Sequence, residues 1–319
     1  MITVWIPAEK GLQRHELVDG KLPPEAVWID VLEVTREEEQ LIEQSLGIEM
    51  PTRAEMQEIE ASNRLYREGQ AVYMTSTMLI KTETEAPETT AVTFILTNKI
   101  LVTLRYAEPW SFRIFSTRVA KSGAINADLT FIGLLETTVE RLADLLELVS
   151  LELEHISQST FKLKQAGREH DLQRAIIKIG RCGNIAGKVR ESLLDKGRMV
   201  IFAQQAANEQ LCTEGRARLH AVHLDVQSLA DHVNYTANKI NFLLSATLGL
   251  INIEQNRIIK LFSIAAVIFL PPTLVASIFG MNYELWPATN TWWGFPFAMG
   301  LMCFSVGMTL WYFRRQRWL

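Results

Sequence analysis

A stripe of small and polar side chains runs along an apolar segment near the end of the chain and along the residues just before that segment. At a period of 3.5 residues the stripe comprises Asn252, Asn256, Ile259, Ser263, Ala266, Leu270, Thr273 and Ser277. Amide and hydroxyl oxygens can hydrogen-bond the water held by a cation, and the hydrophobic Ile259 and Leu270 could close an aqueous path by expelling water. The residues alone leave two interpretations open: a water-filled axis lined by the stripe, or hydrogen bonds that join membrane helices.

One apolar run contains most of the stripe, and a second apolar run follows it. The first, Leu261 to Phe279, and the second, roughly Trp292 to Phe313, contain no charged residue, and each is long enough to cross a bilayer as a helix. Basic residues flank both runs on the same side, with Arg257 and Lys260 before the first and three arginines after the second. By the positive-inside rule, we expect both chain ends in the cytoplasm and the turn between the runs outside.

A hairpin of two helices cannot enclose an aqueous path by itself, so it must either anchor something or oligomerise. No proline occurs between Asn208 and Pro271, and the apolar pattern there stays helical, which predicts one helix of about 70 residues running from cytoplasm through membrane. Such a helix is stable in water only if one face is packed, most simply against copies of itself. Gly249 and the pair Pro271-Pro272 are places where it could bend.

The chain before residue 126 has the composition of an α/β domain. Runs rich in Val, Ile, Thr and aromatic residues predict strands at Val27–Val31, Ala71–Ile80, Ala91–Leu96 and Ile100–Leu104, the last two joined as a hairpin by Thr97-Asn98-Lys99. Helices are expected at Arg36–Leu46, with Thr35 as N-cap, and at Arg53–Ile59. We find no phosphate loop, zinc spacing or nucleophile–base pattern, and therefore expect no enzymatic activity.

From Asp128 onward the hydrophobic period is helical. The first helix has an apolar face made by Leu134, Leu135, Val139, Leu142, Leu145, Leu146 and Val149, and acidic residues cover the rest. A second, antiparallel helix is expected from about Arg168 to Met199. The expected domains are residues 1–125, an α/β domain; 126–256, antiparallel helices and a long stalk helix; and 257–319, a transmembrane hairpin continuous with the stalk.

The charge is unevenly distributed along the chain. The net charge is −4, and residues 257–319 hold five basic residues and one acid, so residues 1–256 carry −8. An acidic body of this kind attracts divalent cations and repels nucleic acid, although acidity also serves simple solubility. The three cysteines show no metal or disulfide spacing, which fits a reducing compartment. We expect no secretory signal, because the apolar run at Met1–Pro7 is too short.

A tripeptide and several longer segments carry a family resemblance. They are Gly280-Met281-Asn282 with Tyr283-Glu284 and Pro287 beyond it, Asn252–Lys260, Phe269–Ser277, Val27–Asp30 and Glu58–Ser62. Together they resemble the CorA family of divalent-cation channels over nearly the whole chain. The resemblance implies an α+β membrane protein of a bacterial inner membrane: a cytoplasmic α/β domain, a helical stalk and two C-terminal transmembrane helices, assembled as a funnel-shaped homopentamer. It also implies uptake of hydrated Mg²⁺, with Co²⁺ or Ni²⁺ as further ions, gating by cytoplasmic divalent cation and no covalent cofactor.

The resemblance assigns the selectivity loop to Gly280, Met281 and Asn282. Asn282 would place one amide oxygen per subunit in a ring around the entering ion. Gly280 would allow a backbone conformation that a Cβ hinders, and Met281 would pack behind the ring. From residue type alone, a helix-end cap is the simpler explanation of Asn282.

The outer loop departs from the family pattern. Trp286, Ala288 and Thr289 stand where the family has Met, a second Glu and Leu, which leaves Glu284 as the only acid outside the membrane. This departure favours a zinc transporter of the related ZntB type as the runner-up. A third hypothesis, from a different class, is a membrane-anchored sensor or scaffold that conducts nothing, and the polar stripe argues against it.

Two aspartates of the stalk are candidates for the regulatory cation site. Asp225 and Asp231 are chosen because family members bind the regulatory ion between subunits. The nearby His220, His223 and His232 could hold zinc, although histidines in this pattern are usually solvated residues of a helix surface.

Overall fold

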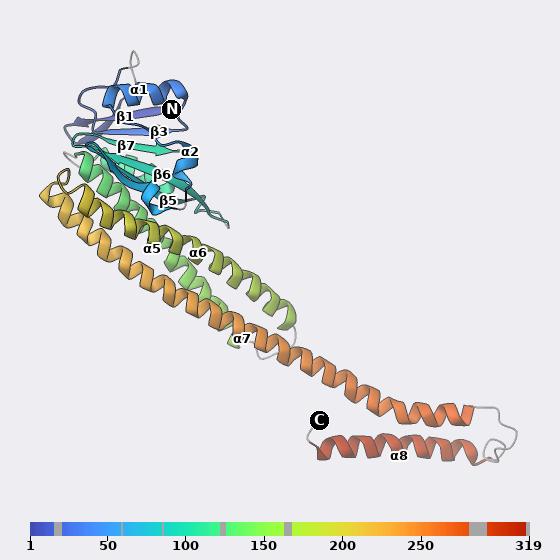
Figure 1. Cartoon of the computed structure of the whole chain (residues 1–319). Helices are drawn as coiled ribbons and strands as arrows, with labels where there is room; N and C mark the ends of the chain where they lie inside the picture. Colours follow the sequence, from blue (N-terminus) through green and yellow to red (C-terminus); the bar gives the residue numbers. More distant parts are fainter. Residues whose placement is uncertain are drawn as a thin grey trace. The chain divides into compact units, whose positions relative to one another are not determined.

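The computed structural model describes residues 1–15, 21–58, 60–84, 86–121, 126–162, 168–280 and 292–316 (Figure 1). The chain forms two compact units, Met1–Lys164 with Gln173–Ser245, and Gln165–Leu172 with Ala246–Leu319. One helix, α7 (Thr213–Gly280), contributes to both units and continues without a break through Gly249 and Pro271-Pro272. The domain boundaries at residues 125 and 256 stay a prediction.

Seven strands form one sheet in the part of the chain that the structure describes. Their spatial order is β2 (Gly11–His15), β1 (Ile2–Ala8), β3 (Trp28–Leu32), β7 (Leu101–Arg105), β6 (Glu88–Leu96), β5 (Ala71–Ile80) and β4 (Leu65–Glu68). β3 and β7 are parallel, and the other neighbours are antiparallel. The expected hairpin is confirmed, since β6 and β7 pair with Leu96 opposite Leu101.

Several short elements were not predicted from sequence. Strands β1, β2 and β4 and helix α4 (Trp110–Val119) are among them. β2 and β4 lie at the two edges of the sheet and carry exposed charged residues. Such residues discourage pairing with further strands, but they also obscure the alternation of apolar and polar residues that predicts a strand. The helix expected at Arg53–Ile59 is shorter, because α2 (Arg53–Met56) ends before Gln57, and α3 (Ala61–Arg64) follows.

Helix α1 (Arg36–Leu46) has the predicted bounds and the predicted cap. The Glu38 amide donates to Thr35 Oγ1 at 3.3 Å, and the Thr35 amide donates to Glu38 Oε2 at 3.0 Å, which forms a capping box. Gly47 ends the helix with φ 65°, a left-handed conformation that glycine adopts without the steric cost of a Cβ.

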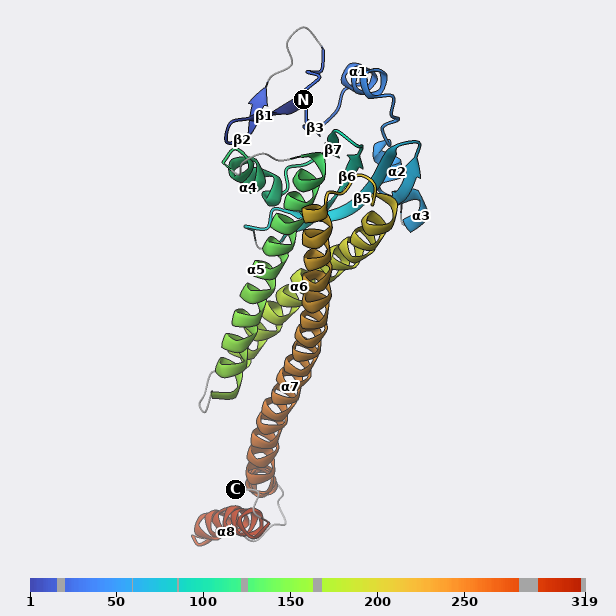
Figure 2. The ribbon, with the colours of Figure 1, turned by 90° about the vertical axis from the view of Figure 1, so that its left-hand side faces the viewer.

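The two faces of the sheet pack against different helices, and the alternation along each strand decides which residue faces which layer. Ile29 and Val102 lie in a core with Ile42 of α1, whereas their neighbours Trp28 and Leu101 lie in a core with α4 and the long helices. The sheet is therefore covered on both faces, as expected for an α/β domain (Figure 2).

A buried ion pair ties the two parallel strands together. Both side-chain oxygens of Asp30 accept from Arg105, at 2.9 and 2.7 Å, and Thr103 Oγ1 donates to Asp30 at 2.8 Å. The guanidinium of Arg105 also lies over the Phe112 ring of α4, 5.0 Å from its centroid. Removing one partner of such a pair leaves a buried charge and costs about 3–5 kcal/mol, so Asp30 in the Trp28-Ile29-Asp30 segment has a structural role here.

Helices α5 (Ala127–Lys162), α6 (Arg168–Ala206) and α7 pack together, and the predicted apolar face of α5 is buried. Some acidic residues on the other side of α5 form ion pairs with the neighbouring helices. Glu136 forms an ion pair with Arg218 of α7 at 2.6 Å, and Glu152 forms one with Lys178 of α6 at 2.8 Å. These carboxylates therefore link α5 to its neighbours.

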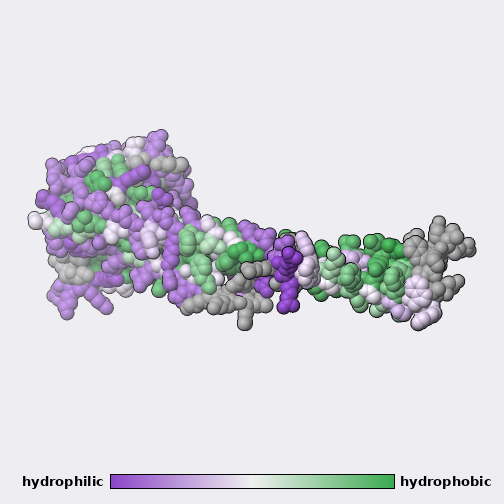
Figure 3. All heavy atoms as spheres, turned by 90° about the horizontal axis from the view of Figure 1, so that it is seen from below, coloured by the Kyte–Doolittle hydropathy of each residue, from purple (hydrophilic) through white to green (hydrophobic). Residues whose placement is uncertain are grey.

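Within the described ranges, two helices are long and apolar enough to cross a membrane, α7 and α8 (Gly294–Arg315). Their apolar windows are 0% and 11% buried in the single chain, unlike core helices of a soluble protein. Figure 3 shows mostly hydrophobic surface over this part of the chain and mostly hydrophilic surface over the sheet and the first helices. The two expected spans thus correspond to the C-terminal part of α7 and to α8.

Candidate functional site

The polar stripe forms one exposed face of α7. All eight of its residues belong to this single helix, and each is exposed in the isolated chain. Ile259 is 61% exposed and Leu270 is 66% exposed, so no other described part of the chain covers even the apolar members of the stripe. A surface of this kind is available to other copies of the chain or to an aqueous path.

Partly buried residues lie on the other face of α7. Ile264, Ile268, Val275 and Phe279 are partly covered, and the ring of Phe279 lies 6.4 Å from that of Phe297 in α8. At about 100° per residue, these positions lie roughly half a turn around the helix from the stripe. α8 therefore packs on the face opposite the stripe and leaves the stripe free.

Hydroxyl groups of both apolar helices bind the backbone of their own helix. Thr273 Oγ1 donates to the Phe269 carbonyl at 2.7 Å, and Thr309 Oγ1 donates to the Ser305 carbonyl at 2.9 Å. These bonds satisfy the hydroxyl proton locally and leave oxygen lone pairs of Thr273 on the stripe face as acceptors.

The selectivity loop lies mostly outside the described residues. Met281, Asn282 and Glu284 fall there, so their predicted roles stay predictions. Gly280 is described: it ends α7, its φ is not positive, and a Cβ added to it would meet nothing within 4 Å. Among the described residues, nothing therefore obstructs a Cβ at Gly280, and the role of Gly280 in the selectivity loop stays a prediction.

The predicted regulatory aspartates do not converge with other ligands in one chain. Asp225 and Asp231 are both exposed on α7. Among the described residues, no group of three or more His, Cys, Asp or Glu side chains is placed to hold a metal ion. His232 Nε2 instead lies 3.3 Å from Ser150 Oγ. A site at Asp225 or Asp231 would need ligands from a second subunit.

Sequence reasoning passed over a polar cluster in the first unit. Lys196 of α6 is fully buried and lies among polar groups of β5. The sequence spacing could have indicated that Lys196 is buried. Lys196 lies three residues after Leu193 and three before Met199, which places it on the buried face of α6.

Comparison with known proteins identifies the family. Residues 24–315 match the family model described as CorA-like Mg2+ transporter protein. The chain belongs to the CorA family. It is 34% identical over 296 residues to the magnesium transport protein CorA of Pasteurella multocida, covering 92% of each chain. It is 34% identical over 321 residues to that of Escherichia coli K12, covering 100% of each.

Solved structures share the fold of this CorA family member. The complete CorA magnesium transporter of Methanocaldococcus jannaschii has a TM-score of 0.74 at 17% identity, covering 100% of this chain and 99% of that one. The ZntB cytoplasmic domain of Vibrio parahaemolyticus has a TM-score of 0.61 at 8% identity, covering 78% and 97%. The predicted architecture of an α/β region, a long helix and two C-terminal apolar helices is confirmed.

Proposed function

We propose that the protein is a homopentameric channel that takes up hydrated divalent cations, chiefly Mg²⁺, with Co²⁺ or Ni²⁺ as further ions. The observation that carries the proposal is the polar stripe on the face of α7 opposite α8. Arranging copies of α7 around an axis would bring these faces together, whereas a mere anchor has no use for such a stripe. The full-length similarity to magnesium transport proteins supports Mg²⁺ as the ion.

The chemistry of the stripe suits a hydrated ion. Mg²⁺ sheds its water reluctantly, so neutral oxygens that hydrogen-bond this water are appropriate ligands. Asn252, Asn256, Thr273 and Ser277 offer such oxygens, and a ring of Asn282 amides at the outer mouth would select the entering ion. Rings of hydrophobic Leu270 and Ile259 would close the path by dewetting.

We further propose an inner-membrane location with both chain ends in the cytoplasm, and gating by cytoplasmic divalent cation. Basic residues at both inner ends of the hairpin support the orientation. Asp225 and Asp231, exposed on α7, remain candidate ligands for a regulatory cation held between subunits. Bound cations would neutralise the repulsion between acidic subunits and favour the closed state.

A flux assay tests the proposal. The purified protein, reconstituted in vesicles, is assayed for uptake of Mg²⁺, Co²⁺, Ni²⁺ and Zn²⁺, with and without a pH gradient. We expect saturable Mg²⁺ uptake that needs no pH gradient. Uptake of Zn²⁺ alone would establish the ZntB-type alternative, which the altered loop at Trp286, Ala288 and Thr289 favours. Oligomers that carry none of the four ions would establish the non-conducting scaffold.

A further inference from the structure

Lys196 of α6 is a fully buried lysine with three neutral oxygen neighbours. Its exposed fraction is 0%, and Nζ lies 2.9 Å from the Thr77 carbonyl oxygen, 2.9 Å from Ser192 Oγ and 3.4 Å from Ser76 Oγ. Ser76 and Thr77 belong to β5, and Ser192 lies one turn earlier on α6. Lysine is almost never fully buried unless it is paired with an opposite charge.

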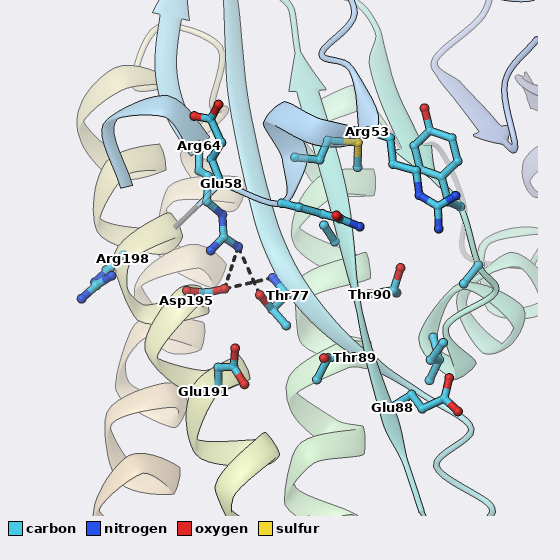
Figure 4. A pocket seen from close by; sticks show the side chains of 16 residues that line it. Arg53, Glu58, Arg64, Thr77, Glu88, Thr89, Thr90, Glu191, Asp195 and Arg198 are labelled. Carbon is cyan, nitrogen blue, oxygen red and sulfur yellow. Dashed lines mark hydrogen bonds and ion pairs between the residues drawn. The ribbon is translucent and has the colours of Figure 1, made fainter. Parts of the chain in front are cut away.

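The same point joins α6 to the sheet. The Thr77 amide donates to Asp195 Oδ2 at 3.1 Å, the Thr77 carbonyl accepts from Ser192 at 2.8 Å, and Thr77 Oγ1 accepts from Arg64 at 3.2 Å. Arg64 also forms an ion pair with Asp195 at 2.7 Å (Figure 4). Every polar group of Thr77 is therefore bound to α6 or α3.

The charges around Lys196 do not balance it. Asp195 is the one described carboxylate that raises the pKa of Lys196, and it is already engaged by Arg64 and by the Thr77 amide. Strand β5 contributes only neutral groups to the cluster. Among the described residues of α5 and α7, Asp128 is the only charged residue that is buried. Its carboxylate accepts from the Cys212 amide and does not pair with Lys196.

A pocket lies beside the cluster. It has a volume of about 600 Å³ and is lined by Thr77, Asp195, Glu191 and Arg198, among others (Figure 4). Lys196 is not part of the lining, but its neighbours Thr77 and Asp195 are. Thr77, whose carbonyl oxygen accepts from Lys196, therefore borders the pocket directly.

We propose that Lys196 is a proton-operated switch, in which proton binding weakens the attachment of α6 to β5 at Thr77. Both protonation states have partners at the site. The ammonium donates to three oxygens, whereas the neutral amine donates to two and accepts from Ser76 or Ser192, whose hydroxyl can turn to donate. The charged form is the costlier of the two, because it sits in a fully buried site without a carboxylate of its own.

The pKa of Lys196 places the switch near neutral pH. Burial lowers it to about 7 from the usual 10.5; Asp195 opposes this shift and Arg64 adds to it. A local opening that hydrates Lys196 restores the usual pKa, so the open state binds more protons between these two values. The attached state is therefore least stable below pH 7 and gains stability as the pH rises above 7. Between pH 6 and pH 8, the opening constant should fall by about tenfold.

The switch is connected to the helix that bears the stripe. α6 and α7 share the main core cluster, with Val189 and Leu193 of α6 and Val226 of α7 among its members. α7 continues to Gly280 and carries the stripe. Weaker attachment of α6 to the sheet would therefore leave α7 freer to move. An effect on ion flux rests on the function proposed above, whereas the effect on α6 and β5 does not.

Hydrogen exchange of the full-length protein tests the inference. Protection factors are measured by mass spectrometry at pH 6 and pH 8 for peptides covering residues 71–80 and 188–200, corrected for intrinsic exchange rates. We expect protection about tenfold lower at pH 6 in the wild-type protein and in the control Lys178→Met, which removes an exposed lysine of the same helix. In Lys196→Met the two pH values should give equal protection.

Two outcomes overturn the switch: equal protection at both pH values in the wild-type protein, or a pH dependence that persists in Lys196→Met. The wild-type measurement decides even if Lys196→Met does not fold. Mg²⁺ uptake at internal pH 6 and 8 is measured in parallel. Vesicles in which no variant carries Mg²⁺ would count against the proposed function alone, because hydrogen exchange judges the switch independently.

Discussion

Asn282 carries the most specific functional expectation at the scale of single residues. If it caps a helix end, Asn282→Gly should be tolerated, because glycine keeps the left-handed backbone freedom. If its amide selects the ion, the same change removes the oxygen ring and should reduce Mg²⁺ flux at least tenfold. The measurement is uptake by reconstituted protein after the oligomer has been checked by size-exclusion chromatography. Stable oligomers of Asn282→Gly with wild-type flux would rule out the selectivity ring.

Glu284 is expected to act on ion capture rather than on selection. It is the only acid in the outer turn, and exposed charge acts on encounter and is screened by salt. Glu284→Gln should therefore lower uptake a few-fold at low ionic strength and have little effect at high ionic strength. Uptake is measured at limiting Mg²⁺ over a range of salt concentrations. A loss of the same size at every salt concentration would contradict capture by steering.

At the scale of one element, α7 offers a matched pair of leucines in the apolar run. Leu270 belongs to the stripe, whereas Leu274 is exposed on a flank of the same helix. If Leu270 closes the path by dewetting, Leu270→Ala should raise the leak of Mg²⁺ several-fold in the closed state, and Leu274→Ala should not. Flux is measured with millimolar Mg²⁺ inside the vesicles. Equal leaks in the two variants would remove Leu270 from the gate.

At the scale of the whole molecule, the orientation in the membrane can be measured by labelling. In a background without Cys182, Cys212 and Cys303, a cysteine replacing Ile2 and one added at the C-terminus should react only from the cytoplasmic side. A cysteine replacing Thr289 should react only from outside, because the basic residues that flank both runs stay in the cytoplasm. Termini that react from opposite sides would end the hairpin topology.

Regulation by cytoplasmic Mg²⁺ also concerns the assembled molecule. Cations bound between acidic subunits would hold the closed state together, and their removal would let the helices separate. Residues 130–256 should therefore be cleaved several-fold more slowly by protease in millimolar Mg²⁺ than in chelator. Cleavage sites are mapped by mass spectrometry, with a detergent-solubilised protein lacking ion gradients as the sample. Equal cleavage rates in the two conditions would argue against cation-dependent closure.

Features that depend on neighbouring residues were determined by the sequence alone. The N-cap at Thr35, the hairpin around Asn98 and the two apolar spans follow from local propensity and periodicity. The 3.5-residue stripe and the family resemblance can likewise be recognised from the sequence alone. Edge strand β4 escaped prediction because its four residues are too few to establish a period.

Contacts between residues far apart in the chain were decided only by the tertiary structure. Asp30 and Arg105 are separated by 75 positions, and Lys196 and Thr77 by 119, so no local pattern links them. The same holds for α8, whose contact with the face of α7 around Phe279 leaves the stripe uncovered. A lysine in a sequence is charged and solvated by default. Lys196 loses its water only because β5 and the long helices close around it, and that burial, which no residue type encodes, is what brings its pKa to about 7.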